Sequence, residues 1–200
     1  MGQPTDSADN TERFEIVALA ASAGGLNALT HVLSALPADF PAALVVVQHL
    51  DRRHRSLMAT ILSKRTQLQV KEASEGDRLA PGTAIIAPSN RHLLVNGDGS
   101  LSLTQTELVH FVRPSADLLF ESTAAAFGMR AIAVVLSGTG RDGAMGVKAI
   151  KERGGTVIVQ DDASEFGGMP QAAREAVAVD FVLPLDDIAP ALRTLLSSVR

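Results

Sequence analysis

Three apolar runs, each followed by polar side chains, dominate the hydrophobic pattern of the chain. The runs are residues 16–21, 42–47 and 131–136. A continuous apolar run bounded by turn residues is typical of a strand that is buried on both faces. Ser22 follows the first run, Gln48-His49 the second, and the stretch from Ser137 to Asp142 the third. Because ligands of open parallel sheets bind beyond the carboxyl ends of the strands, we expect these polar residues at one sheet edge.

Apolar residues recur at helical spacing in the stretches between the strands. The first helix opens at Gly24 or Gly25, and its apolar positions are Leu26, Leu29, Val32, Leu33 and Leu36. A spacing of three and four residues puts these side chains on one helix face. Pro114 precedes the third helix and Gly128 ends it. This third helix is expected at residues 116–127, and the other helices at 55–65, 143–153, 170–177 and 188–198.

Short β-branched stretches complete the predicted sheet. The first strand is expected at residues 14–20, and further strands at 69–72, 83–87, 156–160 and 181–183. The turn Asn96-Gly97-Asp98-Gly99 joins residues 92–95 and 101–104 into a hairpin, because Asn-Gly and Asp-Gly pairs accept positive φ angles. Alternating strands and helices predict an α/β fold with a mostly parallel sheet covered on both faces.

Composition narrows the class of protein without pointing to a function. The chain has 200 residues, a hydrophobic content of 46% and a net charge of −4, which fits one domain with a substantial core. General nucleic-acid binding normally needs a basic stripe, so we expect no nucleic-acid partner. No apolar stretch approaches the roughly 20 residues of a membrane helix, so we expect no membrane insertion. Residues 1–13 are polar and predict a disordered tail, which leaves residues 14–200 as the folded domain.

Ser22, His49 and Asp142 are candidates for a nucleophile, a general base and the group that orients the base. The chain has no cysteine, so a thiolate nucleophile and cysteine metal sites are excluded. Of the five histidines, only His49 directly follows a long buried strand. His49 taken alone is more often structural or solvated, and Asp142 followed by Gly143 also suits a simple turn or helix cap.

The loop Ala21-Ser22-Ala23-Gly24-Gly25 admits two chemical interpretations and a purely structural one. Glycines between a strand and a helix let the backbone approach an anion, which suits either a phosphate or an oxyanion beside a serine nucleophile. The loop matches neither the dinucleotide-binding nor the P-loop glycine pattern, and it is not a G-x-S-x-G elbow. The same residues also form ordinary strand–helix turns.

The polar ends of the three runs resemble one known family. Ala21-Ser22-Ala23-Gly24-Gly25, Val46-Val47-Gln48-His49 and the stretch from Leu136 to Ala144 look like the catalytic domain of CheB-type chemoreceptor methylesterases. Further matching stretches, in the family's order, are residues 87–93, 113–120, 160–164 and 168–173. Each stretch is short, but the ordered set is specific and extends from about Phe14 to Leu196.

The resemblance implies a serine hydrolase that removes methyl esters from glutamate side chains of chemoreceptors and, in some members, deamidates receptor glutamines. By motif, Ser22 matches the nucleophile, His49 the general base and acid, and Asp142 the orienting residue. Backbone N–H groups near Ala23–Gly24 and Thr139–Gly140 would hold the oxyanion. The resemblance implies no metal and no organic cofactor. It also implies a doubly wound sheet with one antiparallel hairpin near an edge.

This chain departs from the common family pattern at three positions near the site. Ala23 stands where threonine is frequent, Thr139 where methionine is frequent, and Val112 where histidine is common. These residues resemble the variant that is fused to a receptor methyltransferase. The usual enzyme also has an N-terminal receiver domain, and only thirteen polar residues precede the first expected strand here. Either the chain is a piece of a longer protein, or it is not regulated by a receiver of its own, or a partner regulates it. In the last case a separate receiver domain or a receptor methyltransferase is a candidate partner, beside methylated receptor signalling helices in the cytoplasm.

Three arginines are candidates for contacts with the substrate. Arg52 and Arg53 follow His49 closely, and Arg113 precedes a predicted helix. A basic rim would steer an acidic receptor helix toward the serine, although a solvated charged loop explains the same residues. The pairs Asp161-Asp162 and Asp186-Asp187 have no accompanying histidine ligand pattern, so we expect helix capping and loop solvation there.

Two other classes of function remain open on the sequence alone. A small-anion or nucleotide-binding α/β module would use the Ser22 loop without covalent chemistry, and phosphates would raise its melting temperature. A catalytically idle adaptor would bind receptor arrays, and that binding would survive Ser22→Ala. The hydrolase is the leading hypothesis, because the resemblance covers all three candidate catalytic residues.

Overall fold

The strands that the apolar runs predict lie in one parallel sheet. The computed structural model describes residues 15–49 and 56–197. In this part of the chain, the seven-stranded sheet has the order β3-β4-β2-β1-β7-β8-β9, with every neighbouring pair parallel. The strands are β1 (Glu15–Ala21), β2 (Ala42–Gln48), β3 (Gln69–Glu72), β4 (Thr83–Ile86), β7 (Ala131–Val135), β8 (Thr156–Gln160) and β9 (Phe181–Leu183).

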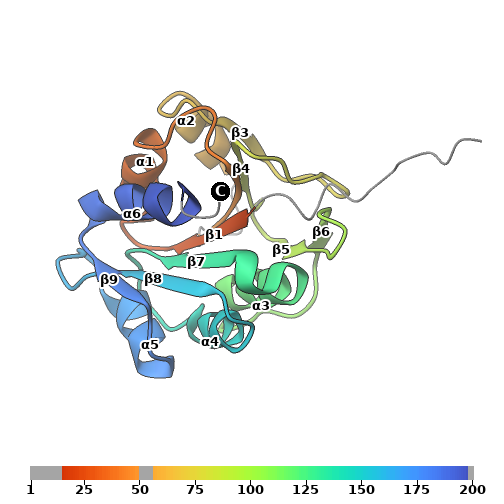
Figure 1. Ribbon diagram of the computed structural model, residues 1–200. Coiled ribbons are helices and arrows are strands. Elements are labelled where there is room, and N and C mark those ends of the chain that lie inside the picture. Colours follow the sequence, from red (N-terminus) through yellow and green to blue (C-terminus); the bar gives the residue numbers. More distant parts are fainter. Residues whose placement is uncertain (1–14, 50–55, 198–200) are drawn as a thin grey trace, which may run out of the picture.

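Helices cover both faces of the sheet, as Figure 1 shows. One layer contains α1 (Gly25–Ser34), α2 (Met58–Ser63) and α6 (Leu185–Ser197). The other contains α3 (Ala116–Phe127), α4 (Ala144–Glu152) and α5 (Gly168–Ala176). Along β1, Val17 and Leu19 pack toward the first layer, whereas Ile16 and Ala18 pack toward the second. Both faces of β1 are therefore buried, which explains why its sequence is apolar without alternation.

The predicted hairpin is present and forms a sheet of its own. Strands β5 (His92–Val95) and β6 (Leu101–Thr104) pair antiparallel, and His92 stands opposite Thr104. The hairpin lies beside α3 at one side of the molecule (Figure 1). A short 3-10 turn, η2 (Gly128–Arg130), follows α3 and leads into β7. The doubly wound fold and its antiparallel hairpin are confirmed.

Several predicted helix boundaries were wrong by a few residues. Helix α5 begins at Gly168 rather than at residue 170, and α6 begins at Leu185 rather than at 188. The first turn of α6 contains Asp186 and Asp187, whose charges favour a helix N-terminus although they add nothing to the apolar pattern. Helix α2 begins only at Met58. The expected tail, residue 14 of the first expected strand and residues 50–55 lie outside the described residues.

The order of the strands places the site between β1 and β7. From β1 the chain passes through α1 to β2 on one side, and from β7 it passes through α4 to β8 on the other. The carboxyl ends of β2, β1 and β7 are therefore neighbours at the point where the sheet reverses its winding. Open α/β sheets bind ligands at such a switch point. None of the described helices combines the length and the hydropathy that crossing a bilayer requires.

Candidate active site

Ser22 stands at the end of β1 in a tight turn that leads into α1. Its backbone N–H donates to the carbonyl oxygen of Ser137 at 3.0 Å, and its own carbonyl oxygen accepts from the N–H of Gly25 at 2.9 Å. The third loop, residues 136–143 between β7 and α4, passes directly beside Ser22: a Cβ on Gly138 would lie 2.9 Å from the Cβ of Ser22. The position of Ser22 is thus fixed from two sides by backbone contacts.

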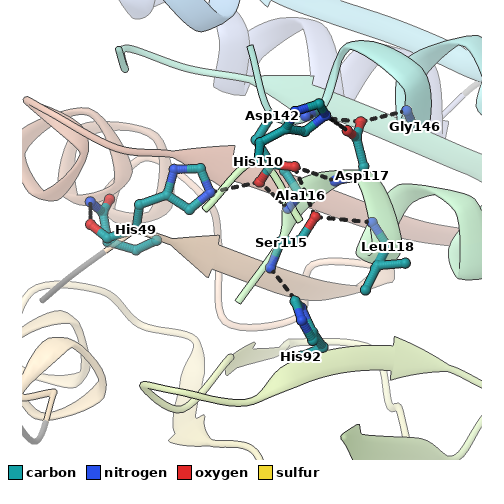
Figure 2. Close-up of polar contacts among 11 residues, drawn as sticks. His49, His92, His110, Ser115, Ala116, Asp117, Leu118, Asp142 and Gly146 are labelled. Atoms are coloured by element: carbon teal, nitrogen blue, oxygen red, sulfur yellow. Dashed lines mark hydrogen bonds and ion pairs between the residues drawn. The ribbon is translucent and has the colours of Figure 1, made fainter. Parts of the chain in front are cut away.

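His49 lies beside Ser22 and points toward Asp142. The β1–β2 pairing ends at Ala21 and Gln48, so Ser22 and His49 occupy the next positions on adjacent strands. The backbone N–H of His49 still donates to the carbonyl oxygen of Ala21 at 3.0 Å. Its imidazole Nε2 lies 2.7 Å from Oδ2 of Asp142, and the side chain is 9% exposed (Figure 2). The structure therefore joins two of the three predicted residues by a direct hydrogen bond.

The carboxylate of Asp142 is held by the N-terminus of α3. Besides His49, it accepts from the backbone N–H of Ala116 at 2.6 Å, from the N–H of Asp117 at 3.1 Å and from the Ser115 hydroxyl at 2.8 Å (Figure 2). Burial raises the pKa of Asp142, but the hydrogen bonds from His49 and Ala116 outweigh it, so the pKa lies below its ordinary value. An ionised Asp142 favours the imidazole tautomer with its proton on Nε2.

Ser115 connects this carboxylate to a buried histidine. The Ser115 hydroxyl caps α3 by accepting from the N–H of Leu118, and the backbone N–H of Ser115 donates to Nδ1 of His92 at 3.2 Å. On the other side of the ring, Nε2 donates to the carbonyl oxygen of Glu107 at 3.0 Å. His92 is fully buried, and this burial lowers its pKa. A neutral His92 thus holds Ser115, the N-cap residue of α3, in place.

Asp117 holds the helix that follows Asp142. Its Oδ1 accepts from the N–H groups of Gly143 at 2.9 Å and Gly146 at 2.8 Å, which open α4. Its Oδ2 lies 3.2 Å from Nε2 of His110 on the connector before α3 (Figure 2). Burial and the charge of Asp142 raise the pKa of Asp117, despite the hydrogen bonds from α4. The N-terminus of α3 thus binds the carboxylate of Asp142, and the N-terminus of α4 binds the carboxylate of Asp117.

The Ser22 hydroxyl is near the imidazole in register but not bonded to it. Within residues 15–49 and 56–197, neither the Ser22 hydroxyl nor Nδ1 of His49 makes a hydrogen bond. Because Nε2 faces Asp142, Nδ1 is the ring nitrogen that is left to accept a proton from serine. Nucleophile–base hydrogen bonds are often long without substrate and tighten when it binds. The geometry is therefore that of a hydrogen-bonded His49–Asp142 pair with Ser22 beside it.

The amide groups predicted to bind an oxyanion lie on two loops that touch. The Ser137 hydroxyl donates to the carbonyl oxygen of Ala23 at 2.9 Å, which ties the third loop to the first. In the described part of the chain, no acceptor pairs with the N–H of Ala23, Gly24, Thr139 or Gly140. Gly24 and Gly140 have φ angles of +74° and +89°, which favour glycine. These residues leave backbone donors beside Ser22, and their role stays a prediction.

The predicted substrate contacts fall into two groups. Arg52 and Arg53 lie outside the described residues. Arg113 donates from Nε and Nη2 to Oδ1 of Asn90, at 3.1 and 2.7 Å, and from Nη1 to the carbonyl oxygens of Gln105 and Thr106. This guanidinium fastens the connector before α3, so its role in binding a substrate stays a prediction.

The acidic pairs of the sequence make local contacts. Oδ1 of Asp161 accepts from the N–H of Ala163, and Asp162 pairs with Arg174. Asp186 pairs with His31 at 2.8 Å, where both side chains are exposed. The expected capping and loop roles fit these contacts.

Sequence reasoning missed the residues that hold Asp142. Ser115 before an apolar helix, with Asp117 in the first turn, is an N-cap signal that the pattern contains. That signal describes the helix alone and says nothing of a carboxylate from another loop. His92 gave no signal beyond its place at the start of a strand. The contacts of these residues become visible only when α3, the hairpin and the third loop pack together.

Comparison with known proteins assigns the family. The fold and site define an α/β protein with a histidine–aspartate pair beside a serine at the switch point of the sheet. A family model described as CheB methylesterase matches residues 17–192, and the chain belongs to this family. The crystal structure of the Thermotoga maritima CheB methylesterase catalytic domain superposes with a TM-score of 0.87 at 35% identity, covering 91% of this chain and 98% of that one.

Curated relatives agree with this assignment. A protein-glutamate methylesterase/protein-glutamine glutaminase of Moorella thermoacetica is 44% identical over 92% of this chain and 45% of its own length. Protein-glutamate methylesterase FrzG of Myxococcus xanthus is 45% identical over 90% of this chain and 54% of its own length. The chain thus spans about half of these relatives. A Leptospira interrogans relative, 41% identical, is covered over 92% of its length.

Proposed function

We propose that this chain is a serine hydrolase that removes methyl esters from glutamate side chains of chemoreceptors. The observation that carries the proposal is the convergence of Ser22, His49 and Asp142 at the ends of β1, β2 and β7, with His49 bonded to Asp142 at 2.7 Å. The names of the relatives supply the reaction and its substrate class, the methyl esters of protein glutamate side chains. The proposed place of action is the cytoplasm, where receptor signalling helices lie.

The proposed reaction begins with attack of the Ser22 hydroxyl oxygen on the ester carbonyl carbon. Nδ1 of His49 accepts the serine proton, and Asp142 stabilises the resulting imidazolium through Nε2. The negative charge that forms on the carbonyl oxygen is stabilised by hydrogen bonds from the backbone N–H groups of Ala23, Gly24, Thr139 and Gly140. Collapse of this intermediate breaks the bond to the methoxy oxygen, which takes the proton from His49 and leaves as methanol. The glutamyl group remains esterified to Ser22.

Hydrolysis of the acyl-enzyme repeats the same proton transfers with water. His49 accepts a proton from the attacking water, and the serine oxygen leaves as its hydroxyl after receiving that proton. The products are a free glutamate side chain and an unmodified Ser22. A glutamine side chain enters the same sequence with ammonia as the leaving group, which agrees with the glutaminase activity in the name of the Moorella relative.

Methanol release from a methylated receptor signalling domain tests the proposal. Wild type should release methanol, and Ser22→Ala should abolish release. Ser34→Ala is the matched control, because the Ser34 hydroxyl, an exposed group at the end of α1, bonds only the carbonyl oxygen of His31 among the described residues. Inactive but folded wild type, tried on several receptors, would contradict the proposal. Receptor-array binding without turnover would favour the adaptor, and a rise in melting temperature with phosphate would favour the anion-binding module.

A further inference from the structure

Gln48, the last residue of β2, touches the backbone of both Ser22 and His49. Its side-chain Nε2 donates to the carbonyl oxygen of Ser22 at 2.7 Å and to the carbonyl oxygen of His49 at 3.0 Å. The residue is 6% exposed. A side-chain amide nitrogen has two hydrogens, and here each of them has one acceptor. A single buried group thus spans the loops that follow β1 and β2.

The orientation of this amide is fixed by its surroundings. If the amide were turned over, its oxygen would face two carbonyl oxygens at hydrogen-bond distance, which is repulsive. In the orientation observed, Oε1 lies against the N-terminal turn of α1, where a Cβ on Gly25 would overlap it. No described residue donates to Oε1. The partial positive charge of a helix N-terminus favours an oxygen at this place.

The amide acts at the end of the β-ladder, next to the last backbone bond between the two strands, from the N–H of His49 to the carbonyl oxygen of Ala21. The register of β1 and β2 ends at Ala21 and Gln48, and Ser22 and His49 lie one residue farther. We propose that Gln48 is a positioning residue that sets the separation between the Ser22 hydroxyl and the His49 imidazole by binding both backbone carbonyls. This inference rests on the proposed hydrolase function of Ser22 and His49.

Gln48→Met tests the proposal by removing both donors at nearly constant side-chain length. Because an error of about 1 Å in the reacting groups can cost on the order of 100-fold in rate, we expect kcat to fall about 10- to 100-fold, with little change in KM. Thr66→Val is the matched control. It removes two side-chain bonds at the far end of α1, from Thr66 Oγ1 to the carbonyl oxygen of Leu33 at 2.6 Å and from the N–H of Leu68 to Thr66 Oγ1 at 3.3 Å. Its kcat should stay at the wild-type value.

Gln48→Glu gives a readout that a purely structural role would not move. An ionised carboxylate cannot donate and repels the two carbonyl oxygens, whereas a protonated one regains a donor. Burial raises the pKa of a carboxyl group at this place. The ratio of its kcat to wild-type kcat should therefore rise as the pH falls, while the same ratio for Gln48→Met should stay flat. Parallel pH profiles for both variants would overturn the proposal.

Amide hydrogen exchange separates this proposal from the proposed function. If wild type releases no methanol, the hydrolase proposal fails, and the exchange rates of residues 21–25 still test the contact. Faster exchange there in Gln48→Met, but not in Thr66→Val, supports Gln48 as the link. Unchanged exchange, or a Gln48→Met kcat within about twofold of wild type, would overturn it. Should Gln48→Met fail to fold, the pH profile of Gln48→Glu decides.

Discussion

Asp142 is a buried carboxylate that stays ionised because its donors outweigh its desolvation. The residue is 4% exposed, and burial alone favours the protonated acid. Both oxygens accept two hydrogen bonds, from His49, Ser115 and the backbone of Ala116 and Asp117. These donors keep the pKa below its usual value. The charge of Asp142 is thus a property of its partners.

Asp142→Asn tests the role of that charge. Asparagine has no charge that favours a proton on Nε2 of His49, and an amide group that donates to Nε2 places the imidazole proton on Nδ1, the nitrogen otherwise left to accept the serine proton. Such an imidazole cannot accept the serine proton, so we expect kcat to fall about 10³- to 10⁴-fold. Methanol release measures this change. Asp180→Asn is the control, because the Asp180 carboxylate pairs with Lys151 and the N–H of Val157, away from the three candidate catalytic residues. A loss smaller than about tenfold would contradict the assigned role.

Gly138→Ala tests how closely the third loop fixes the nucleophile. The added Cβ would overlap Sδ of Met169 and would lie 2.9 Å from Cβ of Ser22. The methionine end can move, but Ser22 is held by its backbone, so the serine should shift and kcat should fall about 10- to 100-fold. Gly97→Ala is the control, since no atom of the residues that the structure describes lies within 4 Å of its Cβ position. Equal kcat for both variants would show that Ser22 tolerates the methyl group.

The N-termini of α3 and α4 stabilise each other across the site. Ser115 caps α3 and also donates to Asp142, which precedes α4 by two residues. Asp117 in the first turn of α3 accepts from the N–H groups that open α4. Helix N-termini favour negative charge, so each helix gains a carboxylate from the neighbouring segment. The pair of helices therefore places Asp142 as one unit.

Ser115→Ala removes the cap and one donor to Asp142 at once. Loss of an N-cap costs about 1 kcal/mol of the free energy of unfolding, and loss of a bond to a charged group about 1.5–3 kcal/mol. We expect destabilisation in urea of roughly 2.5–4 kcal/mol together with a lower kcat. Ser63→Ala, which removes an exposed bond to the carbonyl oxygen of Thr60, is the control. Unchanged stability would show that the cap contributes little.

The strands could be predicted from the sequence, whereas the exact helix ends and the residues that hold the candidate catalytic residues could not. The burial of β1, β2 and β7 on both faces leaves a continuous apolar signal, so Ser22 and His49 could be placed at their ends. The start of α6 depends on Asp186 and Asp187, which leave no trace in an apolar period. The contact from Gln48 to Ser22 joins residues 26 positions apart. Such contacts depend on strand register, which one strand's sequence does not specify.

The reversal of winding between β1 and β7 joins the three loops into one site. Ser22 and His49 come from the side that packs with α1, and Asp142 from the side that packs with α3 and α4. No single layer contains all three residues, so the site exists only when both layers pack on the sheet. Three buried titratable groups of this junction, His92, Asp117 and Asp142, also link the stability of the whole domain to pH.

Asp117→Asn separates the opposing effects of these groups on stability. The pKa of Asp142 is lowered in the fold, so the stabilisation from this group is lost as the pH falls through that pKa. The pKa of His92 is also lowered, so this group too makes the fold less stable as the pH falls below about 6.5. The pKa of Asp117 is raised, so the folded state binds more protons than the unfolded state above about pH 3.9, and stability falls as the pH rises through the raised value.

The asparagine keeps an acceptor for Gly143 and Gly146 but has no charge to bury. Relative to wild type, the free energy of unfolding of Asp117→Asn should therefore rise between about pH 4 and pH 7, as measured in urea. Glu121 works in the same direction, because burial, Asp117 and Asp142 raise its pKa. Asp39→Asn, which removes a carboxylate on the loop before β2, is the control for the substitution itself. A difference between Asp117→Asn and wild type that does not change with pH would mean that the carboxylate of Asp117 is buried without cost.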